Sequence, residues 1–567
     1  MTRKTPPKDL LDWMGVSDAP DWSRARLLGR AVSFVLLLLF LLALGSALVV
    51  LGGILTGGEG SLGAGALIVA ILSAPFLIWG TWIKHRTLGF QKEGHLTDRL
   101  AKAVEQLGAE KTVKKIVEND DGNPVTRETT EPNLEVRIGG LLSLERIAQD
   151  SVAYDKGRDH VRVMEIICAY IRNNAPANIA KKFPLGEWSR PLVDADGETL
   201  AVYQKYAELR WGGVSEAGYY DGNIIEWARS LPPPRVDIMV ALTVLERRSE
   251  LQRSYEAAHG QKTDDVEERP FEIPSHGSSE PPDLQPVNLA SAYAFRDQIG
   301  KRRQVRHEYQ GYRLDLRQTC LQRAQLCAFR LGGVLLDDSR LEGAQLGKAQ
   351  LTGARLEAAR LDGANLQATQ MAGTGLRWAR FDGAILIDAQ LEGARLGWAV
   401  LEGACLEEAR LEVADLRAAK LTGADLGRAK LEGANLSLAS LNFADLNNAL
   451  LEGANFYSAE LEGANLWRAN LNSANFEYAR LERAKLDFAT LDGATFRSVD
   501  LSAVSKLTIK EVARAFGDAS VVWPDDLGPK PAHWPNWELD ISSFDTEYAL
   551  WLADPSTYTP PPPPTSP

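Results

Sequence analysis

A bulky apolar residue recurs at every fifth position of residues 316–501, and no insertion interrupts the series. It is leucine at each of these positions except Met371, Phe381, Phe456, Phe476 and Phe496. Throughout residues 379–494 an alanine stands two places before it. Because a period of five matches neither the period of a helix nor that of a strand, no single helix or strand could keep these residues on one buried face. A chain that turns a corner once per unit can do so, which predicts a solenoid of stacked coils.

Glycine indicates how many units form one coil. Over much of the series a glycine stands two places after every second central residue, at Gly343, Gly353, Gly363, Gly373, Gly383, Gly393, Gly403, Gly423, Gly433, Gly453, Gly463 and Gly493. A three-sided coil would stack these glycine corners on bulky ones, whereas a four-sided coil of twenty residues stacks like on like. The four-sided coil also aligns Phe456, Phe476 and Phe496 in one column and Trp378 with Trp398 in another.

Typical units read Ala-Asn-Leu at residues 464–466 and Ala-Asp-Leu at residues 424–426. They resemble the motif Ala-(Asp/Asn)-Leu-x-x of the pentapeptide-repeat proteins. The resemblance implies that residues 312–503 form a right-handed, four-sided β-helix with the central residue and the small residue before it pointing inward. With coils spaced like neighbouring strands, about nine coils give a rod roughly 45 Å long. The sequence departs from the motif where Arg or Lys precedes the central residue, as at Arg360 and Lys420, and regular side-chain ladders are not expected there.

Two uncharged runs near the N-terminus, residues 31–55 and 62–83, are each long enough to cross a bilayer as a helix. Basic residues flank their outer ends, namely Arg24, Arg26, Arg30, Lys84 and Arg86, whereas the loop between them carries only Glu59. This asymmetry predicts a transmembrane hairpin with both termini in the cytoplasm. A buried core helix, or a signal peptide for the first run, is the less favoured alternative.

The middle of the chain predicts helices, because apolar residues recur at helical spacing in residues 136–149 and 161–172. It also resembles the helical segment that membrane-anchored pentapeptide-repeat proteins of bacteria carry between anchor and solenoid. That resemblance implies the bacterial inner membrane, with the solenoid in the cytoplasm. Near the C-terminus, Thr508 and Glu511 form a capping box, which predicts a short helix over residues 508–516 that covers the last coil.

The predicted organisation comprises eight segments. They are a cytoplasmic segment (1–30), the transmembrane hairpin (31–83), an α-helical domain (84–256), a flexible linker (257–287), an N-terminal cap (288–311), the β-helix (312–503), a C-terminal cap with a Trp-rich extension (504–553) and a disordered Pro-rich tail (554–567).

A basic cluster lies just before the solenoid, at Lys301, Arg302, Arg303 and Arg306. It is interpreted as a solvated helix end, with anionic lipid or nucleic acid as the alternative ligand. Glu392, Glu412, Glu432 and Glu452 lie twenty residues apart and predict an acidic, solvated stripe on one edge.

Nothing in the sequence predicts catalysis. The four cysteines and seven histidines show no metal-ligand spacing, and no phosphate-binding loop or nucleophile motif is present. We therefore expect no enzyme activity, no cofactor and no metal. The net charge of −12 is not that of a nucleic-acid-binding protein, so no direct contact with nucleic acid is expected.

Three functions remain open. The favoured one is a membrane-tethered scaffold that presents a rigid rod to a protein partner or to a second copy. The second is DNA mimicry against a type II topoisomerase, which the resemblance implies for some members. Mimicry needs a surface of one sign, and in the solenoid acidic and basic residues are nearly balanced. The third is an unrecognised activity of the helical domain.

One corner column of the predicted coil is apolar. Two places after the central residue, at intervals of twenty, stand Trp378, Trp398, Leu438 and Tyr478. These residues are predicted to point outward, and exposed apolar patches mark contact sites. They form the candidate interaction surface. The alternatives are that the linker or the Trp-rich extension covers this column, or that stacking between coils alone favours the aromatic residues.

Overall fold

The computed structural model describes residues 97–118, 124–154, 159–183, 223–259, 311–505 and 507–563, together with Gly45, Leu48, Gly52, Gly53 and Gly157. The chain divides into two units, Met1–Asp98 and Arg99–Pro567, and almost all described residues belong to the second. The transmembrane hairpin falls outside the described residues except at four positions, which are helical. Within the described part, no helix combines the length and the apolar character needed to span a bilayer. The segment 1–30, most of the linker, and the predicted cap 288–311 except Gly311 also fall outside it.

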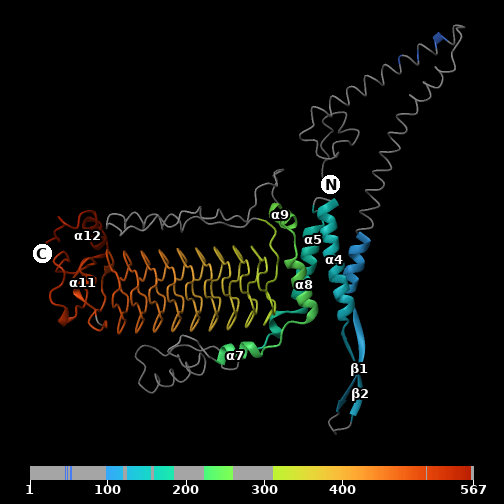
Figure 1. Cartoon of the computed structure of the whole chain (residues 1–567), viewed down its shortest axis with the longest axis horizontal. Coiled ribbons are helices and arrows are strands. Elements are labelled where there is room, and N and C mark those ends of the chain that lie inside the picture. Colours follow the sequence, from blue (N-terminus) through green and yellow to red (C-terminus); the bar gives the residue numbers. More distant parts are fainter. Residues whose placement is uncertain are drawn as a thin grey trace. The chain divides into compact units, whose positions relative to one another are not determined.

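The helical domain predicted for the middle of the chain is present (Figure 1). Its helices are α4 (Leu134–Tyr154), α5 (His160–Asn174), α7 (Asn223–Ser230), α8 (Val236–Glu246) and α9 (Glu250–Ala258). The helices α4, α5 and α8 pack together around Leu144, Ile167 and Leu242, none of which is exposed. The helical periodicity of residues 161–172 therefore predicted α5 correctly.

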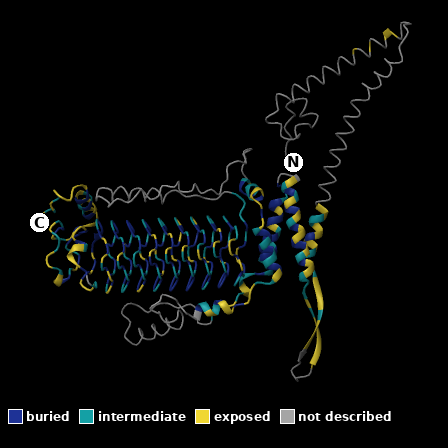
Figure 2. Cartoon of the chain, viewed as in Figure 1, coloured by how far each residue is buried: buried dark blue, intermediate teal, exposed yellow. Residues whose placement is uncertain are grey.

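A β-hairpin interrupts this domain where only helices were expected. Strand β1 (Glu110–Glu118) pairs antiparallel with β2 (Pro124–Pro132), with Glu110 opposite Pro132. Most of its residues are exposed (Figure 2). Because the hairpin buries no apolar face, its strands lack the alternation of apolar and polar residues by which a strand is recognised in sequence.

The solenoid is a stack of four-sided coils of twenty residues, as predicted (Figure 1). Parallel bridges join residues twenty apart on every side, for example Asn435 to Asn455 and Lys430 to Leu450. The N–H of Leu436 donates to the carbonyl of Asn455 at 2.8 Å, and the same pattern repeats along the stack. Central residues and the alanines before them are buried (Figure 2).

Each corner of the coil is a tight turn whose second corner residue has positive φ. This holds at the glycines, such as Gly353 at 64°, and also at Trp378 at 57° and Lys348 at 59°. Such turns favour glycine, because a Cβ is strained in the left-handed region. Since many non-glycine residues occupy the same conformation here, the turn alone does not require glycine.

The helical domain covers the first coil of the solenoid. Pro176 forms an antiparallel bridge with Thr319, and the N–H of Cys320 donates to the carbonyl of Ala175 at 2.6 Å. An ion pair between Arg172 and Asp315 at 3.0 Å adds to the contact. An open strand edge must be covered, and residues 175–177 do so at this end. The cap predicted at residues 288–311 lies outside the described residues except Gly311, and the role of the helical domain at this end was not predicted.

A buried polar cluster also connects the helical domain to the first coils of the solenoid. The carboxylate of Glu256 contacts His160 at 2.8 Å and also binds the guanidinium of Arg248. Arg248 donates to the carbonyl of Arg330 in the solenoid at 2.9 Å, and the N–H of Tyr312 donates to the carbonyl of Glu256 at 2.7 Å. Buried charges that are paired in this way fix the geometry of the two parts they join.

The last coil is covered by residues 507–563. The N–H of Thr508 donates to the carboxylate of Glu511 at 2.8 Å, so the capping box forms, but the helix α11 (Ile509–Val512) is shorter than expected. The chain instead forms β4 (Phe516–Gly517), which pairs in parallel with β3 (Thr495–Phe496). The last coil has a free strand edge whose backbone groups need hydrogen-bond partners. Phe516 and Gly517 supply these partners as β4 and therefore do not continue the helix.

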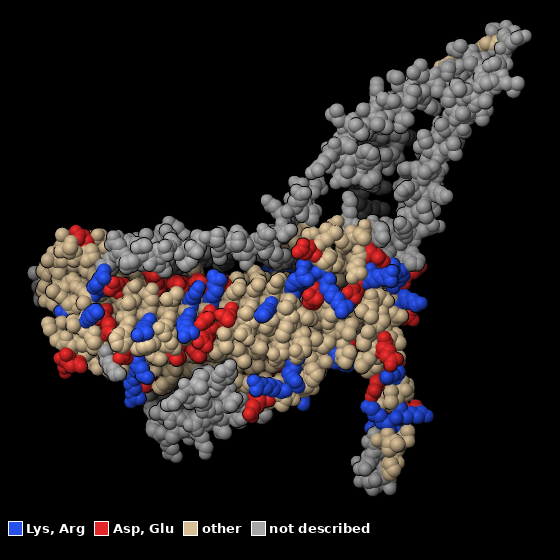
Figure 3. Space-filling view, viewed as in Figure 1, with Lys and Arg blue, Asp and Glu red and all other residues tan. Residues whose placement is uncertain are grey.

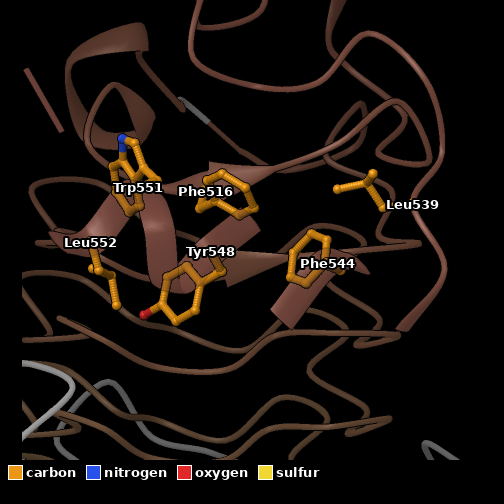
Figure 4. Close-up of a cluster of buried hydrophobic side chains, with 6 residues drawn as sticks. All are labelled: Phe516, Leu539, Phe544, Tyr548, Trp551 and Leu552. Atoms are coloured by element: carbon orange, nitrogen blue, oxygen red, sulfur yellow. The ribbon is translucent and has the colours of Figure 1, made fainter. Parts of the chain in front are cut away.

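The Trp-rich extension packs on this end of the solenoid. Phe516 lies at the centre of a cluster with residues of α12 (Ile541–Ala553), namely Phe544, Tyr548, Trp551 and Leu552, and with Leu539 (Figure 4). The hydroxyl of Tyr548 donates to the carbonyl of Gly493 at 2.7 Å, which ties the cluster to the coil. A short 3-10 helix, η2 (Asp525–Leu527), lies between β4 and α12 in the chain. The start of the Pro-rich tail is also held, because Trp537 donates to the carbonyl of Pro561 at 3.2 Å.

Candidate interaction surface

The predicted apolar column lies on the outside of the solenoid. Trp378 is 53% exposed, Trp398 46% and Leu438 57%, and Tyr478 is half-buried. All of them have positive φ at a corner, which directs the side chain away from the coil. The rings of Trp378 and Trp398 stack with centroids 5.7 Å apart and planes 15° from parallel. We call Trp378, Trp398, Leu438 and Tyr478 the tryptophan edge.

The structure adds Tyr457 to this surface. Its ring lies 5.4 Å from that of Tyr478 in an edge-to-face contact, and it is 39% exposed. Sequence reasoning missed Tyr457 because it follows the central residue directly, in a column that is otherwise charged or small. The exposed aromatic residues Phe443 and Phe488 lie on other corner columns and do not belong to it.

Unpaired cations adjoin the tryptophan edge. Arg377, Arg395 and Lys420 form no ion pair within the described ranges, and the buried Nε of Arg377 has no hydrogen-bond partner there. The neighbouring carboxylate of Asp415 is held by Arg417 and by Asn435. Carboxylates lie here as well, because Glu357 and Arg395 both come within 4 Å of a Cβ built on Gly375, so this surface carries charges of both signs.

A second edge of the solenoid is occupied by α7. Gly343, Gly363 and Gly383 form a corner column, and a Cβ built on Gly343 would lie 2.5 Å from the carbonyl oxygen of Ala228 in this helix. A Cβ on Gly383 would lie 2.8 Å from the side chain of Ile224. Here the absence of a side chain lets the helix approach the coil.

Carboxylates lie buried next to this glycine column. Glu342 accepts from Arg340 at 2.6 Å, and Asp382 accepts from Arg380 at 2.6 Å. Between them, burial and the charge of Asp382 raise the pKa of Asp362 to about 7. Paired arginines thus offset only part of the cost of stacking these carboxylates.

The raised pKa of Asp362 predicts that the packing of α7 on the solenoid weakens as the pH rises. The pKa of Asp362 in the folded protein is raised above its ordinary value of 3.8. Its contribution to the free energy of unfolding is therefore complete below pH 3.8 and is lost as the pH rises through about 7. Asp382 and Glu342 oppose ionisation of Asp362, and Arg380 and Arg360 favour it. We expect hydrogen exchange of the α7 amides, corrected for intrinsic rates, to increase several-fold from pH 5 to pH 8. In Asp362→Asn the increase should be much smaller, and an equal increase in both proteins would refute the assignment.

A family model for pentapeptide repeats matches the chain in 8 copies, over residues 319–357, 359–397, 394–433, 434–466 and 464–502. The solenoid is built of pentapeptide repeats. The chain is similar to HetL of the cyanobacterium Nostoc sp. strain PCC 7120, a solved pentapeptide repeat protein involved in heterocyst differentiation regulation. The identity is 29%, over 35% of this chain and 81% of HetL, with a TM-score of 0.25.

Two further solved structures are similar to parts of the chain. A pentapeptide repeat protein of the Arabidopsis thaliana thylakoid lumen is 30% identical, over 20% of this chain and 63% of its own, with a TM-score of 0.12. QnrB1, a plasmid-mediated fluoroquinolone resistance protein, is 18% identical, over 32% of this chain and 88% of its own, with a TM-score of 0.21. No curated protein matches the sequence.

A third edge of the pentapeptide-repeat solenoid differs from the solvated stripe that its sequence predicts. Glu452 is only 1% exposed, and the side chains of Glu392 and Glu412 are 14% and 25% exposed. Burial raises the pKa of Glu432 to about 7 and raises those of Glu392 and Glu452. The prediction of a solvated stripe is therefore wrong, because sequence spacing gives the column but not what covers it.

Two cysteines in the part of the chain that the structure describes, one in α5 and one in the solenoid, are not activated. Burial raises the pKa of Cys168 to about 12 and that of Cys405 to about 11, which opposes thiolate formation. In the same part of the chain, no group of His, Cys, Asp and Glu side chains has the arrangement that a metal ion needs.

Proposed function

We propose that this protein is a non-enzymatic interaction protein, tethered to a membrane, whose pentapeptide-repeat solenoid binds a protein partner or a second copy along the tryptophan edge. The observation that carries this is the stacked pair Trp378 and Trp398, about half exposed on a rigid coil. Large exposed aromatic side chains are an unfavourable surface for a lone chain and are the residues that dominate binding energy at interfaces.

Rigidity supports the same proposal. The corner N–H of Trp398 donates to the carbonyl of Arg417 at 2.9 Å, and its neighbours in the column are bonded in the same way. A side chain whose backbone is already fixed loses little conformational entropy on binding. The tryptophan edge is thus preorganised to receive a partner.

The membrane tether rests on the sequence of residues 31–55 and 62–83 and on the basic residues that flank them. We place the hairpin in the inner membrane of a bacterium, with both termini and the solenoid in the cytoplasm. DNA mimicry fits the solenoid less well, because acidic and basic side chains are interspersed along its visible face (Figure 3). No direct contact with nucleic acid is proposed.

The test compares Trp378→Ala/Trp398→Ala with wild type, using the full chain extracted from membranes in detergent. We expect the double variant to lose at least about ten-fold in affinity for its partner or for itself, since each tryptophan at an interface contributes up to a few kcal/mol. Analytical ultracentrifugation measures the mass, and pull-down measures the partner. Wild type should sediment with membranes before extraction, as a tethered protein does.

Phe488→Ala provides the matched control, because Phe488 is 70% exposed on a different corner column. It should leave both mass and partners unchanged. If the double tryptophan variant keeps its fold, its mass and its partners, the tryptophan edge is not the binding surface.

A further inference from the structure

The tryptophan edge and the columns beside it form a surface that is complementary to itself when one copy is reversed. Consider two solenoids that face each other along this edge and are related by a two-fold axis perpendicular to both rods. They run antiparallel, and each column of one copy faces the same column of the other in reverse order. Choosing one facing pair fixes all the others, because every column repeats at intervals of twenty residues.

The corner column interlocks in one register. Its facing pairs are Trp378 with Tyr478, Trp398 with Ser458, and Ala418 with Leu438. Trp398 and Leu438 are about half exposed, whereas the residues that they face are small. The remaining pair is aromatic on both sides. Large side chains thus meet small ones or another ring, as the packed centre of an interface requires.

The column that directly follows the central residues matches in charge in the same register. Its facing pairs are Glu357 with Arg497, Arg377 with Glu477, Gly397 with Tyr457, and Arg417 with Ser437. Both pairs of charged residues have opposite signs. A shift by one coil in one direction sets Glu357 against Glu477, and in the other direction it sets Arg377 against Arg497. Because like charges across an interface repel, only one of these three registers is favourable.

Three of these charges have no ion pair with the residues that the structure describes, namely Glu357, Arg377 and Arg497. The Nε of Arg377 and the Nη1 of Arg497 are buried and have no hydrogen-bond partner there. Arg497 is only 9% exposed and lies over the ring of Tyr478 at 5.4 Å, at one end of the tryptophan edge. An opposing charge on a second copy compensates such groups.

Gly397 leaves room for a side chain of the second copy. Its φ is not positive, and a Cβ built on it would meet only the carbonyl oxygen of Arg417, at 3.7 Å, among the described residues beyond its chain neighbours. Packing within the chain therefore does not require glycine here. In the antiparallel register the space lies opposite Tyr457, which is 39% exposed.

The outward column on the other side of the corner is compatible with this register. Arg360 faces Asp500 of the second copy, a pair of opposite sign. Arg380 faces Arg480, but each is held by a carboxylate of its own chain, Asp382 at 2.6 Å and Glu482 at 3.3 Å. The like charges are therefore neutralised before the two copies meet.

We propose that the tryptophan edge binds the tryptophan edge of a second copy in this antiparallel register, with Arg377 beside Glu477. The inference rests on the proposed function, because it names the partner of the same surface. From residue 358 to residue 498 the contact is roughly 34 Å long, and with a width of about 15 Å it buries on the order of 500 Å² per copy. This area is typical of a reversible dimer that dissociates in the micromolar range.

Charge reversal tests the register in the detergent-extracted full chain at low salt, with analytical ultracentrifugation as the readout. Arg377→Glu and Glu477→Arg should each weaken dimerisation at least ten-fold, because each brings like charges together at two symmetry-related positions. The double variant Arg377→Glu/Glu477→Arg, and an equimolar mixture of the two single variants, should both regain the dimer. Arg377 and Glu477 lie five coils, or roughly 24 Å, apart in one chain, so this rescue cannot arise within a copy.

Arg428→Glu is the matched control, because the side chain of Arg428 is 62% exposed on another corner column and pairs with Glu408 at 3.1 Å. It should leave dimerisation unchanged. A dimer that is lost in Trp378→Ala/Trp398→Ala but withstands Arg377→Glu, or is not rescued by the mixture, overturns the antiparallel register and leaves the tryptophan edge as a binding surface. Wild type that stays monomeric at tens of micromolar also overturns the proposal.

Pull-down separates this failure from failure of the proposed function. If wild type is monomeric and Trp378→Ala/Trp398→Ala loses another protein, the tryptophan edge still binds a partner, but not a second copy. If neither mass nor partners respond to the tryptophan substitutions, the proposed function fails as well.

Discussion

Replacing Leu436 with aspartate is expected to unfold the solenoid around it. Leu436 is fully buried, and its side chain fills a slot shared with the coils above and below. A carboxylate there has no partner, which we expect to lower the free energy of unfolding by more than about 4 kcal/mol. Because each coil is stabilised only by its neighbours, the damage should spread to adjacent coils. Chemical denaturation and limited proteolysis of the full chain measure the effect.

Leu438→Asp is the matched control, two residues along the same coil. Leu438 is 57% exposed with φ of 61°, a conformation that aspartate adopts more readily than leucine. We expect a change within about 0.5 kcal/mol. If the two aspartate variants were equally unstable, the inward direction of the central residues would be wrong.

Gly343→Ala is expected to release α7 from the solenoid. Its new Cβ would lie 2.5 Å from the carbonyl oxygen and 3.0 Å from the carbonyl carbon of Ala228, and backbone atoms cannot move aside as a flexible side chain can. The alanine also pays about 1–2 kcal/mol for its left-handed conformation. We expect hydrogen exchange of the α7 amides to rise at least ten-fold.

Gly373→Ala separates the two causes. Gly373 has φ of 65°, close to the 68° of Gly343, but a Cβ there would meet nothing within 4 Å. The conformational cost is therefore common to both variants, and only the contact with α7 differs. Equal exchange of the α7 amides in the two variants would show that the helix does not depend on this glycine column.

Periodicity explains which parts of the fold could be predicted. The central residues, the coil of twenty and the outward direction of Trp378 and Trp398 follow from local repetition, and the structure confirms them. Contacts between distant segments leave no such signature. The bridge from Pro176 to Thr319 and the packing of α7 on Gly343 join parts of the chain that share no pattern.

The candidate site shows the same division. The residues of the tryptophan edge could be predicted from their spacing alone. That Tyr457 joins this surface and that Arg377 has no partner among the described residues became visible only in the structure. The sequence predicted correctly that Glu392, Glu412, Glu432 and Glu452 share one column, but it predicted wrongly that they are exposed, because burial depends on what packs against a surface. Spacing fixes which residues share an edge, and only the structure shows what surrounds them.

The coil of twenty residues restricts how this protein can change in length. Removing a whole coil leaves every later residue on its own side of the stack, so all columns stay in register. Removing a single unit of five keeps the interior apolar but turns the rest of the solenoid by a quarter of a revolution. Tyr478 would then no longer lie in line with Trp398, although the core would still be well packed. Evolution can therefore shorten or lengthen the interior in fives, but it can preserve a surface that spans several coils only in twenties.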